Sequence, residues 1–253
     1  MIFWILTTPR SGSNFITGEI CRRLGGEPRG MEFFNPASVA RRTDFTPDRD
    51  APVHSYLEYL AARESLGGVL AVKMLWIQIE ACCGYPDFVP ALSGRKILVL
   101  RRRDVVRQGV SLYLAFESGA WISTQAPRSH DTVPYDHEKI SAIVARMELH
   151  NAMLGRFVTA FGLDHITMWY EDFLAAPEAE CDRALAYLGL PRTSAPLSAA
   201  ETYSREVTDL APIPMLITVI GRGHSESRAI SQTLGGRGVF TGHRVNRTGG
   251  PSR

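Results

Sequence analysis

The chain has 253 residues, of which 45% are apolar and 21% are charged, so it can bury the core of one domain of ordinary size. This composition excludes disordered, collagen-like and fibrous proteins. The 28 basic and 26 acidic residues give a net charge of +2, a balance too even to indicate a protein that binds nucleic acids.

The sequence shows no pattern typical of a secreted or membrane protein. The apolar run at residues 1–6 lacks a preceding basic region and ends at Thr7, far short of a signal sequence or a membrane span. The four cysteines form no CxxC pair and have no histidines at zinc-ligand spacing, so they indicate neither a zinc site nor a disulfide framework. We therefore expect a soluble, cytoplasmic protein without a metal and without a membrane partner.

Four short apolar segments predict strands, over residues 2–7, 68–75, 96–100 and 165–170. A helix is predicted after each of them, over residues 15–24, 76–83, 104–116 and 177–188, and a further helix over 138–161 follows a polar loop at 117–138. Apolar strands that alternate with helices indicate an α/β fold, in which a P-loop-like parallel sheet carries helices on both faces. Such sheets bind ligands beyond the carboxyl ends of their strands.

The composition changes at residue 221. Residues 221–253 contain eight Gly and six Arg but one acidic residue, Glu226. We therefore predict a single α/β domain over residues 1–220 and a Gly/Arg-rich C-terminal segment over 221–253, which is either disordered or ordered by an anion.

The segment that follows the first strand, residues 7–14, has the composition of an anion-binding loop. Gly12 lets the backbone wrap closely, the next helix begins with partial positive charge, and Arg10 adds a full charge. The segment matches neither GxxxxGK[ST] nor GxGxxG. A turn in which Ser and Asn side chains cap the helix would have the same composition, so the loop alone leaves both interpretations open.

A basic run follows the third strand. Residues 101–103 are all Arg, and Asp104 is a natural N-cap for the next helix. Ser111 lies about two turns into that helix, where its hydroxyl can face the same anion as the arginines. A solvent-exposed run of charges is the alternative interpretation.

Together these segments resemble the sulfotransferases that use 3′-phosphoadenosine-5′-phosphosulfate (PAPS). Pro-Arg-Ser-Gly-Ser at residues 9–13 is similar to the 5′-phosphosulfate loop of that family, with Arg10 in place of its usual Lys. Tyr-Glu-Asp-Phe at 170–173 and Ala-Tyr-Leu-Gly-Leu at 186–190 are similar to its YEDL and FLGL elements. Glu-Phe-Phe-Asn-Pro at 32–36 and Val-Lys-Met-Leu-Trp at 72–76 resemble, within that superfamily, the bacterial trehalose 2-sulfotransferase-like group.

The resemblance implies a site for PAPS and its product, 3′-phosphoadenosine-5′-phosphate (PAP). It implies that the 5′-phosphosulfate is bound by Arg10, Ser11, Gly12, Ser13 and Asn14. It implies that the 3′-phosphate is bound by Ser111 with Arg102 or Arg103, the spacing leaving both arginines open, and by Arg237 if the segment 236–244 closes over the cofactor.

The catalytic residues implied are Glu32, Arg10 and Lys73. In the trehalose 2-sulfotransferase-like group the glutamate of the Glu-Phe-Phe element takes the proton of the acceptor hydroxyl, which places this role on Glu32. His54, His130 and Glu27 are the competing candidates for the base. Lys73, at a strand end, is expected to neutralise charge on the leaving oxygen, although a Lys that merely closes a strand would look the same.

We therefore predict an enzyme that transfers a sulfuryl group from PAPS to a hydroxyl of a small acceptor, a sugar or a secondary metabolite. The alternative is a P-loop-like kinase or a nucleotide-binding or phosphate-binding module. A kinase would require a Walker lysine and a Mg²⁺ carboxylate, neither of which the loop supplies. The sequence names no acceptor and leaves open whether the chain forms a homodimer.

Overall fold

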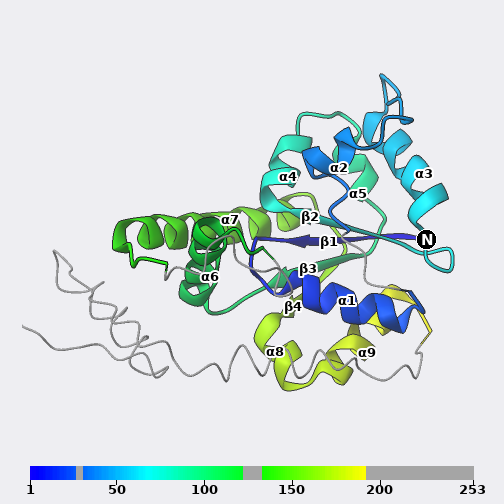
Figure 1. Ribbon diagram of the computed structural model, residues 1–253. Helices are drawn as coiled ribbons and strands as arrows, with labels where there is room; N and C mark the ends of the chain where they lie inside the picture. Colours follow the sequence, from blue (N-terminus) through cyan, green and yellow to red (C-terminus); the bar gives the residue numbers. More distant parts are fainter. Residues whose placement is uncertain (27–30, 122–132, 192–253) are drawn as a thin grey trace, which may run out of the picture. The chain divides into compact units, whose positions relative to one another are not determined.

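The computed structural model describes residues 1–26, 31–121 and 133–191 of the chain. In this part, four parallel strands form a sheet in the order β2-β1-β3-β4 (Figure 1). The strands are β1 (Ile2–Thr7), β2 (Leu70–Leu75), β3 (Ile97–Arg101) and β4 (His165–Trp169). The predicted α/β fold is confirmed, and each predicted strand is present with small shifts at its ends.

Helices cover both faces of the sheet, as predicted (Figure 1). One face carries α1 (Ser13–Arg23), α8 (Tyr170–Ala175) and α9 (Pro177–Leu188). The other carries α4 (Trp76–Cys82), α5 (Phe88–Leu92) and α7 (His137–Ala160), and α6 (Val105–Ser118) packs on α7. The remaining helices of the described residues are α2 (Pro36–Ala40) and α3 (Pro52–Glu64).

The core lies on both faces of β1, where Phe3, Trp4, Ile5 and Leu6 are fully buried. Trp4 faces α5: its Nε1 donates to the Ala91 carbonyl at 3.3 Å, and its ring meets Phe88 edge-on. Burial on both faces is why the strand is an unbroken apolar run rather than an alternating one.

The strand register determines which side chains of β1 and β2 point toward α1. Ile5 pairs with Lys73 of β2, so the two side chains leave the sheet on the same side, opposite to Trp4. The Lys73 ammonium reaches Asn14 in α1. The carboxyl ends of β1 and β2 and the start of α1 therefore meet at one edge of the sheet.

Helices α2, α3, α5 and α8 were not among the predicted elements. The sequence of α3 does contain features that predict a helix: Pro52 occupies its first turn, and Val53, Leu57 and Leu60 bury one face at helical spacing. The predicted polar loop at 117–138 is described only at its ends, where α6 continues to Ser118 and α7 begins at His137; residues 122–132 lie outside the described ranges.

Two further predictions depend on residues that the structure does not describe. The domain boundary at 220 and the C-terminal segment 221–253 both lie outside the described ranges. Within those ranges, no helix is both long and apolar enough to cross a bilayer.

Candidate functional site

The loop between β1 and α1 has the backbone of an anion-binding turn. Arg10 adopts a φ of 61° and Gly12 a φ of 79°, so two residues of the loop lie in the left-handed region. Gly12 is also the N-cap of α1, and no side chain caps this helix. The interpretation in which Ser or Asn caps the helix is therefore wrong. The first helical hydrogen bond of α1 is from the Ile16 N–H to the Gly12 carbonyl at 3.1 Å, so the N–H groups of residues 13–15 have no acceptor within the helix.

Tyr170, at the start of α8, packs directly on this loop. A Cβ atom placed on Gly12 would lie 2.1 Å from Cδ2 of the Tyr170 ring, so the contact requires glycine at position 12. The same ring also contacts Arg102, whose guanidinium carbon lies 4.9 Å from the ring centroid. Tyr170 thus joins the loop after β1 to the loop after β3.

Arg10 turns its side chain toward α6. Its Nε donates to the Ser111 hydroxyl at 2.8 Å, and its Nη1 donates to the Trp121 carbonyl at 2.6 Å. The Arg102 Nη1 in turn donates to the Arg10 carbonyl at 3.3 Å. Burial, and then the neighbouring charge of Arg102, lower the pKa of the Arg10 guanidinium. Arg10, Arg102 and Ser111, three predicted site residues, therefore lie together.

The three consecutive arginines after β3 have three different partners. Arg101 donates to the Asn151 carbonyl of α7, whereas Arg102 lies over Tyr170. Arg103 forms a double hydrogen bond with Asp172 of α8, at 2.6 and 2.7 Å. Of the two arginines that the sequence left open, Arg102 is the one beside the loop.

The backbone after β3 is fixed by two carboxylates. Glu171 accepts from the N–H groups of Arg103 and Asp104 at 3.0 and 3.1 Å. Asp104 accepts from the Arg107 N–H at 3.0 Å, which confirms it as the N-cap of α6. The Glu-Asp pair that follows Tyr170 therefore holds the basic run in place.

Glu32, Lys73 and Asn14 meet on the α1 face of the sheet. The Lys73 ammonium lies 3.1 Å from Oε1 of Glu32, and it also donates to Oδ1 of Asn14. The Lys73 side chain is 3% exposed and that of Glu32 29%, so the carboxylate is the solvent-facing member. The neighbours of Glu32 in the sequence, Met31 and Phe33, are apolar, but the structure pairs the carboxylate with a buried cation.

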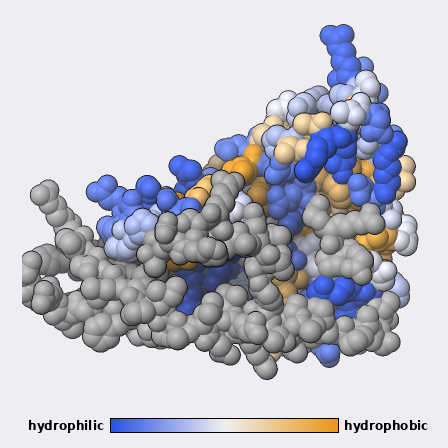
Figure 2. Space-filling view, viewed as in Figure 1, coloured by the Kyte–Doolittle hydropathy of each residue, from blue (hydrophilic) through white to orange (hydrophobic). Residues whose placement is uncertain are grey.

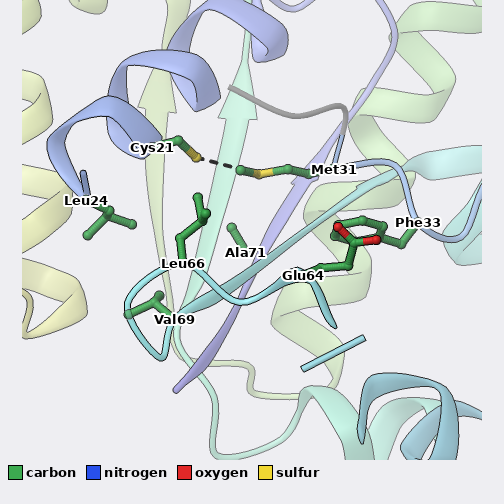
Figure 3. Close-up of a pocket in the computed structure, with 8 residues that line it drawn as sticks. All are labelled: Cys21, Leu24, Met31, Phe33, Glu64, Leu66, Val69 and Ala71. Atoms are coloured by element: carbon green, nitrogen blue, oxygen red, sulfur yellow. Dashed lines mark hydrogen bonds between the residues drawn. The ribbon is translucent and has the colours of Figure 1, made fainter. Parts of the chain in front are cut away.

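The apolar neighbours of Glu32 anchor its backbone instead. Met31 and Phe33 line a small pocket beside α1 and β2 (Figure 3). Cys21 donates to the Met31 sulfur at 3.8 Å (Figure 3). The other lining residues are Leu24, Glu64, Leu66, Val69 and Ala71. Glu64 is the one charged residue of this lining, so the pocket does not share the anion-binding character of the loop.

Of the remaining predicted residues, Ser11 and Ser13 are buried in the loop, and Ser11 shares a 2.5 Å hydrogen bond with Thr7. His54 lies at the start of α3, with its Nδ1 3.2 Å from Asp87. Glu27, His130 and Arg237 are outside the described residues, so their roles stay predictions.

Sequence reasoning missed the polar residues behind the loop. Gln108 of α6 and Asn151 of α7 hydrogen-bond with each other and with Thr8. The described residues contain no cluster of three His, Cys, Asp or Glu side chains that could hold a metal ion.

Comparison with known proteins gives one family. The family model described as Stf0 sulphotransferase matches residues 2–209. A sulfotransferase structure from Alicyclobacillus acidocaldarius is 16% identical over 81% of this chain and 90% of that chain, with a TM-score of 0.45.

Two structures of retinol dehydratase are also similar. One is in a complex with retinol and PAP, at 14% identity over 76% of this chain and 61% of that chain, with a TM-score of 0.37. The other is in complex with androsterone and the inactive cofactor PAP, at 13% identity over 80% and 63%, with a TM-score of 0.39. The comparison with curated proteins gives no match.

The family match decides between the two interpretations that the sequence left open, a sulfotransferase and a kinase-like or binding protein. It spans most of the chain and includes the loop after β1, the basic run after β3 and the Tyr-Glu-Asp segment. The chain therefore belongs to the Stf0 sulphotransferase family and is a PAPS-dependent sulfotransferase.

Proposed function

We propose that this enzyme transfers the sulfuryl group to a hydroxyl of a small acceptor, a sugar or a secondary metabolite, and that Glu32 is the base. The observation that carries the proposal is the contact of Lys73 with both Glu32 and Asn14. It brings a carboxylate, a cation and the start of α1 to one edge of the sheet, which is where an α/β fold binds its ligand.

The residues present fit the two anionic groups of PAPS. Around the loop the donors are guanidinium, ammonium, hydroxyl and backbone N–H groups, the set that binds phosphate and sulfate oxygens. Within the described residues, neither Arg10 nor Arg102 pairs with a carboxylate. The buried Nε of Arg102 has no acceptor among those residues. A buried donor without an acceptor is rare, and a bound anion would supply one.

We assign the 5′-phosphosulfate to Arg10 and the loop that ends in Ser13 and Asn14. We assign the 3′-phosphate to Arg102 and Ser111, because Arg103 is already neutralised by Asp172. These assignments keep the two phosphates on the two loops that Tyr170 joins.

The chemistry then follows from the positions of Glu32 and Lys73. PAPS, when bound, supplies a sulfuryl group attached to a phosphate leaving group. Glu32 accepts the proton of the acceptor hydroxyl, whose oxygen forms the new bond to sulfur, while the bond between sulfur and the bridging phosphate oxygen breaks and its electron pair stays on that oxygen. Lys73 holds the carboxylate in place and keeps a positive charge beside the loop, where negative charge grows as PAP is released. Arg10 and the N–H groups of the loop add to this stabilisation.

The test is sulfation of a panel of sugars and secondary metabolites with labelled PAPS by wild-type enzyme and by Glu32→Gln. We expect the variant to fold and to bind PAP normally while its kcat falls by about 10²–10⁴-fold, the usual effect of losing a general base. Glu64→Gln is the matched control, since Glu64 pairs with Arg42 away from the loop. If Glu32→Gln turned over within a few-fold of wild type, the base would be another residue.

A further inference from the structure

A closed ring of hydrogen bonds lies behind the loop after β1. Gln108 is fully buried, and its Nε2 donates to the Thr8 hydroxyl at 2.9 Å and to the Pro9 carbonyl at 2.6 Å. The Thr8 hydroxyl donates to Oδ1 of Asn151 at 2.9 Å, and Nδ2 of Asn151 donates to Oε1 of Gln108 at 3.4 Å. The ring thus uses both donors and the acceptor of the Gln108 amide.

The ring fixes a peptide plane of the loop. Because the N–H and C=O of a trans peptide point in opposite directions, holding the Pro9 carbonyl also aims the Arg10 N–H away from Gln108. Arg102 holds the Arg10 carbonyl in the same way and so aims the Ser11 N–H. Two successive N–H groups are therefore directed by side chains from outside the loop.

The conformation of Arg10 requires such support. A φ of 61° is unfavourable for a residue that carries a Cβ, so the free loop would leave this conformation for part of the time. Thr8, Pro9 and Arg10 are consecutive, and the ring holds the first two of them. This arrangement would keep Arg10 in the left-handed region.

We propose that Gln108, supported by Thr8 and Asn151, is a positioning residue for the sulfuryl donor. It holds the loop so that its N–H groups face the 5′-phosphosulfate before the donor binds. The inference rests on the proposed function, because it takes the loop as the 5′-phosphate site. Gln108 lies on the same face of α6 as Ser111, one turn earlier, so the helix that carries Ser111 also orients the loop.

The test uses Gln108→Met, which keeps the length of the side chain and removes both donors. Calorimetry would measure the affinity for PAP and for adenosine 3′-monophosphate, which lacks the 5′-phosphate. We expect wild type to bind PAP more tightly. We expect the variant to lose about tenfold in affinity for PAP, in proportion to the loss of the competent loop conformation, and much less for the 3′-monophosphate.

A separate pair of variants covers the case in which Gln108→Met fails to fold. Thr8→Val removes the hydroxyl of the ring and should lose the preference for PAP, whereas Thr8→Ser keeps a hydroxyl and should retain it. Tyr187→Phe is the control for stability alone, since its hydroxyl donates to the Asp164 carbonyl at 2.7 Å near the amino ends of β3 and β4.

The outcomes separate the two proposals. Equal losses for both nucleotides, or no loss for either, would make Gln108 a merely structural residue and overturn the inference. If wild type bound PAP no more tightly than the 3′-monophosphate, the assignment of the loop to the 5′-phosphate would itself be wrong.

Discussion

Replacing Gly12 by Ala tests the contact between the loop after β1 and Tyr170. Position 12 has a φ of 79°, and the added Cβ would lie 2.1 Å from Cδ2 of Tyr170. The ring must therefore move by more than 1 Å to reach an ordinary contact distance of about 3.4 Å or more. That movement disturbs the cation–π contact that the ring now makes with Arg102.

The expected destabilisation has three sources. A residue with a Cβ in the left-handed region costs about 1–2 kcal/mol. Displacing the Tyr170 side chain from its rotamer costs about 0.5–1.5 kcal/mol, and losing the cation–π contact costs about 0.5–1 kcal/mol. We therefore expect Gly12→Ala to lower the free energy of unfolding by about 2–4.5 kcal/mol.

Urea denaturation measures this difference, and Gly189→Ala isolates its first source. Gly189 has a φ of 69° at the end of α9, with no atom within 4 Å of the position of its Cβ, so it carries the backbone cost without the clash. We expect Gly189→Ala to lose about 1–2 kcal/mol. If the two variants were equally destabilised, Tyr170 would not press on Gly12, and the loop geometry described above would be wrong.

Two further predictions follow from the arginines and the cysteines. Arg102→Ala should weaken PAP binding by about 2–4 kcal/mol in calorimetry, because it leaves a bound phosphate unpaired. Arg103→Ala should leave PAP binding within a few-fold, because it breaks an exposed ion pair; the reverse order would move the 3′-phosphate site. Iodoacetamide at pH 8, followed by mass spectrometry, should label exposed Cys83 in the native protein and spare the three buried cysteines. Burial raises the pKa of these thiols to about 12 for Cys21 and Cys82 and to about 11 for Cys181, and labelling at any of them would contradict their burial.

The strands and the loops that follow them could be predicted because their signals are local. An apolar run that ends in Gly, Ser or Arg marks both the strand and the edge of the sheet at which it ends. The N-cap at Asp104 is equally local, since it depends on one side chain and the N–H three residues later. Loop residues around Gly12 could therefore be named from the sequence alone.

The choice between Arg102 and Arg103 could not be made in this way. The three arginines at 101–103 have identical side chains. Arg103 differs from Arg102 because it forms an ion pair with Asp172, about 70 residues later in the sequence. The ring of Thr8, Gln108 and Asn151 was missed for the same reason, because its members come from three separate segments. A polar amide in a helix gives no local sign of whether it faces solvent or a buried hydroxyl.

The Tyr-Glu-Asp segment of α8 determines which positive charges face the site. Glu171 fixes the backbone after β3, and Asp172 neutralises Arg103, while the Tyr170 ring holds Arg102 against the loop. Because Arg102 and Arg10 pair with no carboxylate in the described part of the chain, their charges stay available to a ligand. A net charge near zero can therefore coexist with a positively charged site, since the acidic residues neutralise particular arginines rather than all of them. This selective neutralisation explains how a chain with a net charge of only +2 can bind a donor that carries two anionic groups.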